Sequence, residues 1–190
     1  MKKNYEMDMC SGPILGKLLT FTIPLIFSGI LQLLFNAADV IVVGRFAGSQ
    51  SLAAVGSTTA LINLMINIFI GLSVGVNVIV ARYYGAKREK DVQDTIHTAM
   101  ALSIVSGLFL IVMGQLLSRP MLELMGTPDD VIDKSTIYMR IIFIGMPANM
   151  IYNFGSAILR AVGDTKRPLY FLTAAGVINV VLNLFFVIMF

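Results

Sequence analysis

The sequence contains few charged residues. Only 13% of its 190 residues are Asp, Glu, Lys or Arg, whereas soluble domains carry about 25%. Hydrophobic residues make up 57%, and the mean hydropathy is +0.83. Strand-like alternation of apolar and polar residues is also lacking, which argues against a membrane barrel. The composition therefore predicts an all-α integral membrane protein, a polytopic helical bundle in contact with membrane lipids.

Cysteine and histidine are almost absent. The single cysteine, Cys10, cannot form a disulfide within the chain, and the single histidine, His97, has no second histidine or cysteine cluster as a partner. The zinc motif HExxH and the phosphate-binding motif GxxxxGK[ST] are both missing. We therefore expect neither enzymatic activity nor a cofactor, and no nucleic-acid partner.

Several apolar runs are long enough to cross a membrane as helices of about 20 residues. They predict five spans, at about 18–43, 52–81, 95–117, 133–159 and 168–190. Residues 1–17 form a polar N-terminal tail, and the run after it is too long for the apolar region of a signal peptide. The fifth run continues to the last residue, which suggests a fragment of a longer protein.

The basic residues fall mainly on one side of the predicted spans. Ten lie in the tail and in the second-to-third and fourth-to-fifth connections, and four lie on the opposite side. Because cytoplasmic loops are enriched in Lys and Arg, this asymmetry predicts a cytoplasmic N-terminus.

Asp39 is the most informative residue, because it lies inside the first predicted span. A carboxylate at such depth costs about 2.5–3.5 kcal/mol on insertion scales, and it usually marks a functional site. No Lys or Arg lies within the apolar core of any predicted span, which argues against a structural ion pair. We therefore predict that Asp39 binds an ion, carries a proton or holds a substrate.

Gln32 and Asn36 share a helical face with Asp39. Their oxygens suit a hard cation, so Na⁺ at Asp39 is one possibility. Protonation is the other, because desolvation favours the neutral form of an acid. The two amides serve equally well as cavity residues or as interhelical contacts. Pro24, in the same span, predicts either a hinge or a fixed bend.

Three other spans carry polar faces. The second has Asn63 and Asn67 in line with the glycines of Gly71-LSV-Gly75, a face that favours close helix packing and alternatively a cavity. The fourth groups amides with an aromatic hydroxyl, and the fifth has two amides one turn apart; these residues are Asn149, Tyr152, Asn153, Asn179 and Asn183. The fourth-span group suits either an organic-cation cavity or interhelical hydrogen bonds. The fifth-span pair could complete a pocket with Asp39.

One connection has a distinctive pattern, Arg160-AVGDTKR-Pro168. In it, Gly163 allows a tight turn, and Asp164 or Thr165 can cap a helix that starts near Pro168. This segment resembles the signature of the multidrug and toxic compound extrusion (MATE) family. Ala81-RYYG-Ala86, Ala53-AV-Gly56, Pro24 and the Asp39 end of the first span are similar to that family as well.

The resemblance implies a twelve-helix fold of two six-helix lobes in the cytoplasmic (inner) membrane of a prokaryote. The chain would supply the first five helices of the N-terminal lobe, truncated before the sixth, and its partner would be the missing C-terminal half. The family implies antiport, that is, export of cationic, amphipathic drugs in exchange for H⁺ or Na⁺. In the resemblance Asp39 takes the ion-coupling position with Asn179 as its partner. Asn183 stands where some members carry Asp, which departs from a two-carboxylate relay.

Three functions stay open on the sequence. A secondary multidrug efflux transporter fits the buried acid and the polar faces. A flippase for lipid-linked precursors, from the same superfamily, would need a basic cavity that the predicted spans do not supply. A non-transporting membrane subunit would need a partner-binding domain, and no such domain is evident in the sequence.

Overall fold

The computed structural model describes residues 14–46 and 48–189. In these residues all regular structure is α-helical, which confirms the predicted fold class. The helices are α1 (Ile14–Phe46), α2 (Gly48–Gly85), α3 (Glu89–Leu124), α4 (Asp129–Ile144), α5 (Met146–Ala161) and α6 (Lys166–Met189). Residues 14–17, assigned to the tail by composition, are already helical, because apolar length indicates where the membrane lies rather than where a helix starts. Most of the predicted tail, with Cys10, lies outside the described residues.

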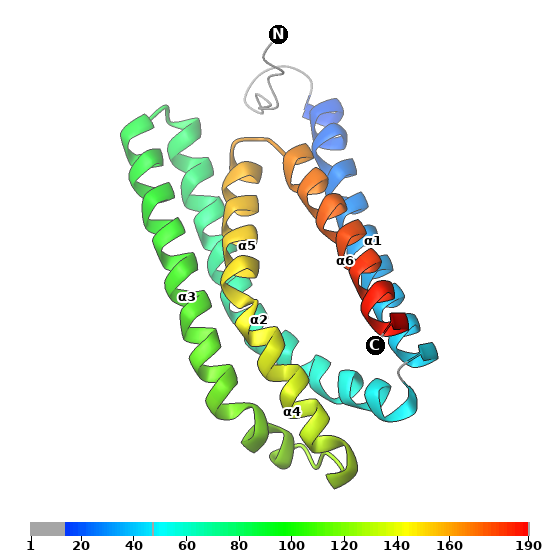
Figure 1. The fold of residues 1–190 in the computed structure, drawn as a ribbon. Helices are drawn as coiled ribbons and strands as arrows, with labels where there is room; N and C mark the ends of the chain where they lie inside the picture. Colours follow the sequence, from blue (N-terminus) through cyan, green and yellow to red (C-terminus); the bar gives the residue numbers. More distant parts are fainter. Residues whose placement is uncertain (1–13, 47, 190) are drawn as a thin grey trace.

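The helices run up and down between two ends of the molecule. The start of α1, the α2–α3 turn and the α5–α6 turn lie at one end, and the α1–α2 and α3–α4 turns lie at the other (Figure 1). Seven described basic residues gather at or near the two turns of the first end: Arg82, Lys87, Arg88, Lys90, Arg160, Lys166 and Arg167. We call this the basic end. The predicted charge asymmetry thus corresponds to one physical end of the molecule.

The fourth predicted span is broken into two helices. α4 and α5 are bent by 48° at Gly145, and together they have the length and apolarity of one span, beside four single helices that also qualify. Pro147 lacks the N–H that would bond the Phe143 carbonyl, and Gly145 instead donates to the Ile142 carbonyl at 3.0 Å. The single helix expected over 133–159 is therefore wrong at this point.

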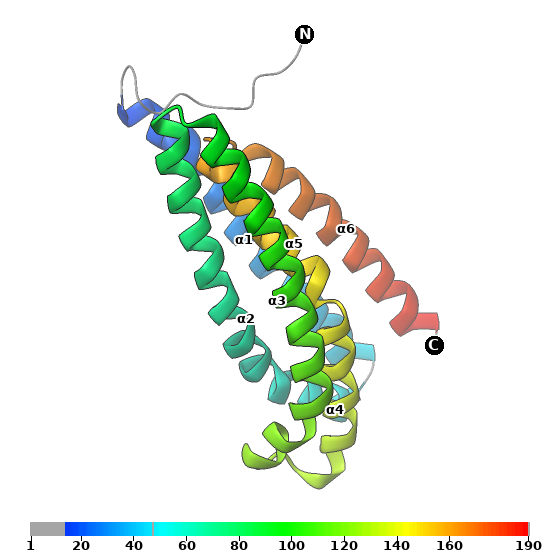
Figure 2. The ribbon, with the colours of Figure 1, turned by 90° about the vertical axis from the view of Figure 1, so that its left-hand side faces the viewer.

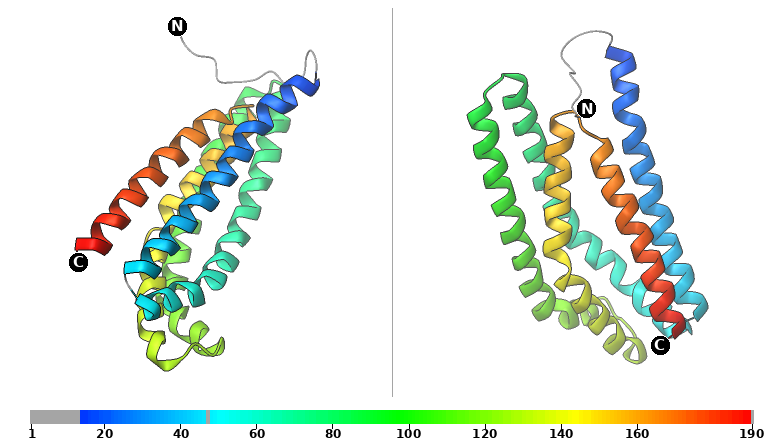
Figure 3. Two further views of the ribbon diagram at one scale, coloured as in Figure 1. Left: turned by 90° about the vertical axis from the view of Figure 1, so that its right-hand side faces the viewer. Right: turned by 45° about the horizontal axis from the view of Figure 1, so that its top comes forward.

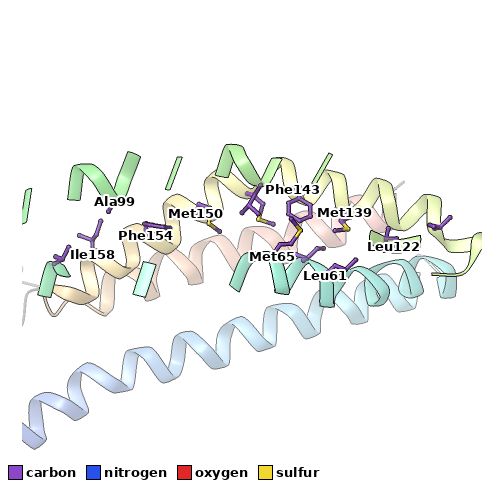
Figure 4. Packing of buried hydrophobic residues seen from close by; sticks show 14 residues of the cluster. Leu61, Met65, Ala99, Leu122, Met139, Phe143, Met150, Phe154 and Ile158 are labelled. Carbon is purple, nitrogen blue, oxygen red and sulfur yellow. The ribbon is translucent and has the colours of Figure 1, made fainter. Parts of the chain in front are cut away.

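Helices α2 to α5 form a bundle around one buried core. Its labelled members include Leu61 and Met65 from α2, Leu122 from α3, Phe143 from α4 and Phe154 from α5 (Figure 4). Two glycines of α3 let the bent helices approach closely: an added Cβ would overlap Pro147 at Gly107 and the Phe143 ring at Gly114. The bend thus fits into small positions on α3.

Helices α1 and α6 form a separate pair. Neither contributes to the described buried core, and the right-hand view of Figure 3 shows them side by side, apart from the bundle. Gly176 of α6 lies against the Phe35 ring of α1 so closely that a Cβ would overlap it. Figure 2 shows the far end of α6 leaning away from the bundle. We refer to these units as the α2–α5 bundle and the α1–α6 pair.

Candidate functional site: an acid–amide contact and a basic cavity

Asp39 and Asn183 are in direct contact across the α1–α6 pair. The Asn183 Nδ2 donates a hydrogen bond to the Asp39 Oδ1 at 2.7 Å, and both residues are half-buried. Asp39 makes no ion pair with any described residue. The expected closeness of Asp39 and Asn183 is thus confirmed, while their role in ion coupling stays a prediction.

The surroundings of Asp39 differ from the expectation in two respects. Asn179, one turn before Asn183, is exposed, and its side chain makes no hydrogen bond within the described part of the chain. Tyr138 of α4, which the sequence did not single out, is half-buried and lies within electrostatic range of the Asp39 carboxylate. Within residues 14–46 and 48–189 no three Asp, Glu, His or Cys side chains gather as metal ligands. A cation at Asp39 would therefore depend on amide, hydroxyl or carbonyl oxygens.

A cavity of about 570 Å³ lies between the pair and the bundle, bordered by α1, α2, α5 and α6. Its larger polar lining residues are Gln32, Asn77, Tyr152, Asn153 and Arg160. Apolar residues such as Phe21, Leu25 and Leu172 complete it. The volume falls within the range of small-molecule sites, roughly 300–1,000 Å³. It is therefore the candidate substrate site of this chain.

Three polar side chains of the cavity donate hydrogen bonds to the protein itself. The Asn77 Nδ2 donates to the Ala157 carbonyl at 2.7 Å, and the Tyr152 hydroxyl donates to the Pro168 carbonyl at 3.2 Å. The Asn153 Nδ2 donates to the Asn149 carbonyl and Oδ1 at 2.9 and 2.6 Å. These bonds leave the amide oxygens of Asn77 and Asn153 as acceptors for a ligand.

Only part of the polar set expected from the sequence reaches this cavity. Gln32, Tyr152 and Asn153 line it, whereas the remaining four are exposed and lie outside it: Asn36, Asn63, Asn67 and Asn149. Asn149 holds Asn153 in place through its Oδ1. Asn77 was missed because it lies two residues beyond Gly75 and therefore falls outside the four-residue spacing of the α2 amides and glycines.

The glycine face of α2 does not pack in the way the sequence suggested. An added Cβ at Gly71 or Gly75 would meet nothing within 4 Å. This face points out of the chain described here, so the expected close helix approach at the Gly71-LSV-Gly75 motif is absent among the described residues. The close glycine contacts are instead those of Gly107, Gly114 and Gly176.

The position of Arg160 also differs from the one predicted from the sequence. The fourth span was expected to end before it, yet Arg160 lies in the last turn of α5, half-buried, and lines the cavity. The long aliphatic stem of an arginine lets the guanidinium follow an apolar wall from a helix end. The cavity therefore contains a basic group, contrary to the expectation that no cation faces the interior.

The turn between α5 and α6 has the predicted capping role. Gly163 adopts φ +86°, and the buried Asp164 accepts at its Oδ1 from the backbone N–H groups of Lys166 and Arg167, both at 3.1 Å. The Arg167 Nε lies 3.2 Å from the other Asp164 oxygen. Thr165 is buried, and α6 begins at Lys166, two residues before Pro168. Asp164 is thus the N-terminal cap of α6.

Pro24 lies inside a continuous α1. Pro24 is buried, and the Ser28 Oγ donates a hydrogen bond to the Pro24 carbonyl at 2.8 Å. Ser28 and Gly29, four and five residues later, line the cavity. The proposed hinge therefore lies close to the cavity, and its movement stays a prediction.

The MatE family model matches residues 24–185, which include the acid–amide contact and every residue that lines the cavity except Phe21. The chain belongs to the MATE family. It is 36% identical over 162 residues to the probable multidrug resistance protein YoeA of Bacillus subtilis, covering 85% of the chain and 35% of that protein. It is 27% identical over 176 residues to an FAD transporter of Shewanella oneidensis, covering 92% of the chain and 38% of that protein.

The fold is similar to solved MATE structures. One of them, the outward-facing conformation of a multidrug resistance MATE family transporter, aligns with a TM-score of 0.81 and 26% identity, covering 88% of the chain and 37% of that structure. The chain therefore spans well under half the length of the relatives it matches. Proteins of the MATE family are transporters rather than enzymes, and the apolar helices make this chain part of a multi-pass membrane protein.

Proposed function

We propose that this chain forms the N-terminal lobe of a secondary efflux transporter, which exchanges amphipathic compounds for H⁺ or Na⁺ bound at Asp39. The whole protein would lie in the cytoplasmic membrane of a prokaryote, with the basic end on the cytoplasmic side. The observation that supports this best is the hydrogen bond from Asn183 to an acid that has no ion-pair partner within the described residues.

The contact suits an ion-free, ionised Asp39. An ionised carboxylate only accepts hydrogen bonds, and here it accepts one from the Asn183 amide. A Na⁺ bound between the two side chains would need the oxygen of Asn183 in place of its nitrogen, so the amide group would have to rotate. A proton on Asp39 would remove the negative charge and add an O–H donor, while the other carboxyl oxygen could still accept from Asn183, so the hydrogen bond would lose its charge-assisted strength. Either ion therefore weakens or rearranges the contact that joins α1 to α6.

The ion site and the cavity share helix α1. Gln32 lines the cavity, and Asp39 follows seven residues later, about 10 Å along a helix that rises 1.5 Å per residue. Residues of α6 also border the cavity at Leu172 and the ion site at Asn183. A change in α1–α6 pairing would thus reach both sites. Coupling needs only that ion and substrate favour different arrangements of this pair.

The class of substrate is a separate question. The resemblance implied organic cations, and the aromatic ring of Tyr152 in the cavity is compatible with one. The relative named as an FAD transporter supports a wider range, because FAD carries two phosphates. Arg160 also weakens the objection to a lipid-linked precursor flippase, which had relied on the absence of a basic cavity residue.

The test is gradient-driven efflux by the whole transporter that contains this lobe, reconstituted in liposomes. Fluorescein and tetramethylrhodamine methyl ester are loaded separately, so that the charge of the dye does not decide the outcome. A Na⁺ gradient at constant pH and a pH gradient without Na⁺ identify the ion. We expect Asp39→Asn to abolish gradient-driven efflux, at least tenfold below wild type.

Asp130→Asn is the matched control, because Asp130 is an exposed acid that follows the α3–α4 turn at the same end of the molecule. It should retain full efflux. Gradient-driven efflux that survives Asp39→Asn would show that Asp39 is structural and that coupling lies elsewhere. Efflux of lipid-linked sugars with neither dye transported would support the flippase instead.

A further inference from the structure

The charge of the cavity is opposite to that expected for a cation exporter. Arg160 is its only charged lining residue, and none of the lining residues is acidic. Within the described part of the chain, the Arg160 side chain makes no ion pair and no hydrogen bond. A half-buried guanidinium with unused donors is a ready partner for a carboxylate or phosphate.

The acids near Arg160 along the chain are already occupied. Asp164 is buried, caps α6 through one oxygen and lies against the Arg167 guanidinium with the other. Asp39 bonds to Asn183 and does not line the cavity. No described acid therefore neutralises Arg160 from the helices that border this space.

A purely structural role for Arg160 explains less. A cation in the last turn of α5 is favourable for the helix dipole, by about 0.3–1 kcal/mol. That effect requires only a position near the helix end, and an exposed side chain would satisfy it equally well. It does not account for an arginine that lines a cavity among Tyr152, Asn153 and Gln32.

The rest of the lining defines the other end of the ligand. Phe21, Leu25 and Leu172 offer apolar contact, while the free oxygens of Asn77 and Asn153 accept hydrogen bonds from ligand N–H or O–H groups. The chemistry is that of an amphipathic molecule with a flat apolar body, one or two donors and an anionic group at the basic end.

We propose that this cavity binds amphipathic organic anions, with Arg160 as the residue that holds the carboxylate or phosphate. The proposal deepens the proposed function, because it names the charge class of the substrate carried by the same lobe. It separates the substrate group, at Arg160, from the coupling ion, at Asp39. The anionic group of the substrate and the coupling cation would then bind at different positions along the α1–α6 pair.

The test is equilibrium binding to the whole transporter in nanodiscs without any ion gradient, followed by fluorescence polarisation. Fluorescein, with its carboxylate ionised and its phenol protonated, is the anionic probe, and tetramethylrhodamine methyl ester is a cationic probe on the same ring system. We expect wild type to favour fluorescein. Arg160→Gln should weaken fluorescein binding about tenfold and leave the cationic probe unchanged or tighter, and Arg160→Lys should retain part of the affinity.

Arg82→Gln is the matched control, since Arg82 is exposed at the basic end and does not line the cavity. Equal losses in Arg82→Gln and Arg160→Gln would overturn the proposal, because they would reflect general surface charge. So would unchanged fluorescein binding in a folded Arg160→Gln, or stronger binding of the cationic probe by wild type. Binding without gradient-driven efflux would contradict the proposed function and leave this inference intact.

Discussion

The α2–α5 bundle and the α1–α6 pair are similarly apolar but are packed very differently. In their most apolar segments, 22% of α2 and 28% of α3 is buried inside the described chain, against 6% for each of α1 and α6. The described core cluster belongs entirely to the bundle. Helices α1 and α6 pack closely against each other but only sparsely against the bundle, and they carry the acid–amide bond and part of the cavity lining. We infer that the bundle is the rigid frame of this lobe and that the α1–α6 pair is the part that moves when ligands bind.

The largest effect should come from breaking the bundle. Phe143→Ala removes a fully buried ring that packs against Gly114 of α3. We expect a loss of about 3–5 kcal/mol from the cavity left behind, measured as a lower melting temperature of the purified protein. Phe171→Ala, on the exposed face of α6, is the control and should melt close to wild type. Equal destabilisation by both changes would remove the distinction between frame and pair.

An intermediate effect should come from separating the pair. Gly176→Ala places a methyl group where the Phe35 ring lies, at a cost of about 1–3 kcal/mol for overpacking. We expect gradient-driven efflux to fall severalfold, because the Asp39–Asn183 contact depends on close α1–α6 packing. The melting of the bundle should change little.

Two further variants sharpen this experiment. Gly75→Ala adds the same methyl group where nothing lies within 4 Å, and it should transport normally. Gly176→Ala combined with Phe35→Ala makes room for the methyl group and should recover part of the efflux. A double variant no better than Gly176→Ala alone would contradict the steric explanation.

The smallest effect should come from the link between the two regions. Tyr152→Phe removes the hydrogen bond from α5 to the Pro168 carbonyl of α6, a change of about 0.6 kcal/mol in a membrane protein. We expect unchanged melting but a broader distance distribution between spin labels at Leu108 and Val181, both exposed. The labels require Cys10→Ser. Tyr170→Phe, on exposed α6 surface, should leave the distribution unchanged, and a similar broadening there would rule out the link.

The number of spans and the grouping of their connections at two ends could be predicted from the sequence. Both depend only on the length of each apolar run and on the basic residues that flank it. The break at Gly145 could not be predicted, although Pro147 was visible, because a proline can bend a membrane helix or be tolerated within it. The bend is possible here because Gly107 and Gly114 on α3 leave room for Pro147 and Phe143. Such a fit between distant residues has no signal in one sequence.

The candidate site was predictable to the extent that one helix determines it. Asp39 could be singled out from its cost in an apolar span, and Asn183 as a polar residue able to meet it. Helical spacing gives the face of a helix but not its neighbour, so Asn63 and Asn67 were grouped with the cavity while Asn77 was missed. Arg160 was misplaced because composition marks the end of a span, whereas a long side chain reaches back along it.

The buried Asp164 turn fixes one end of α6 and leaves its other end to act as a lever arm. Asn183 lies 17 residues beyond Lys166, about 25 Å along the helix, so a tilt of about 5° at the turn moves it by about 2 Å. Asp39 also lies toward the C-terminal end of its helix, but only seven residues before the end of α1 at Phe46, where the chain turns into α2. The hydrogen bond between them therefore connects a long arm to a short one, at the place where a change in helix angle produces its greatest displacement.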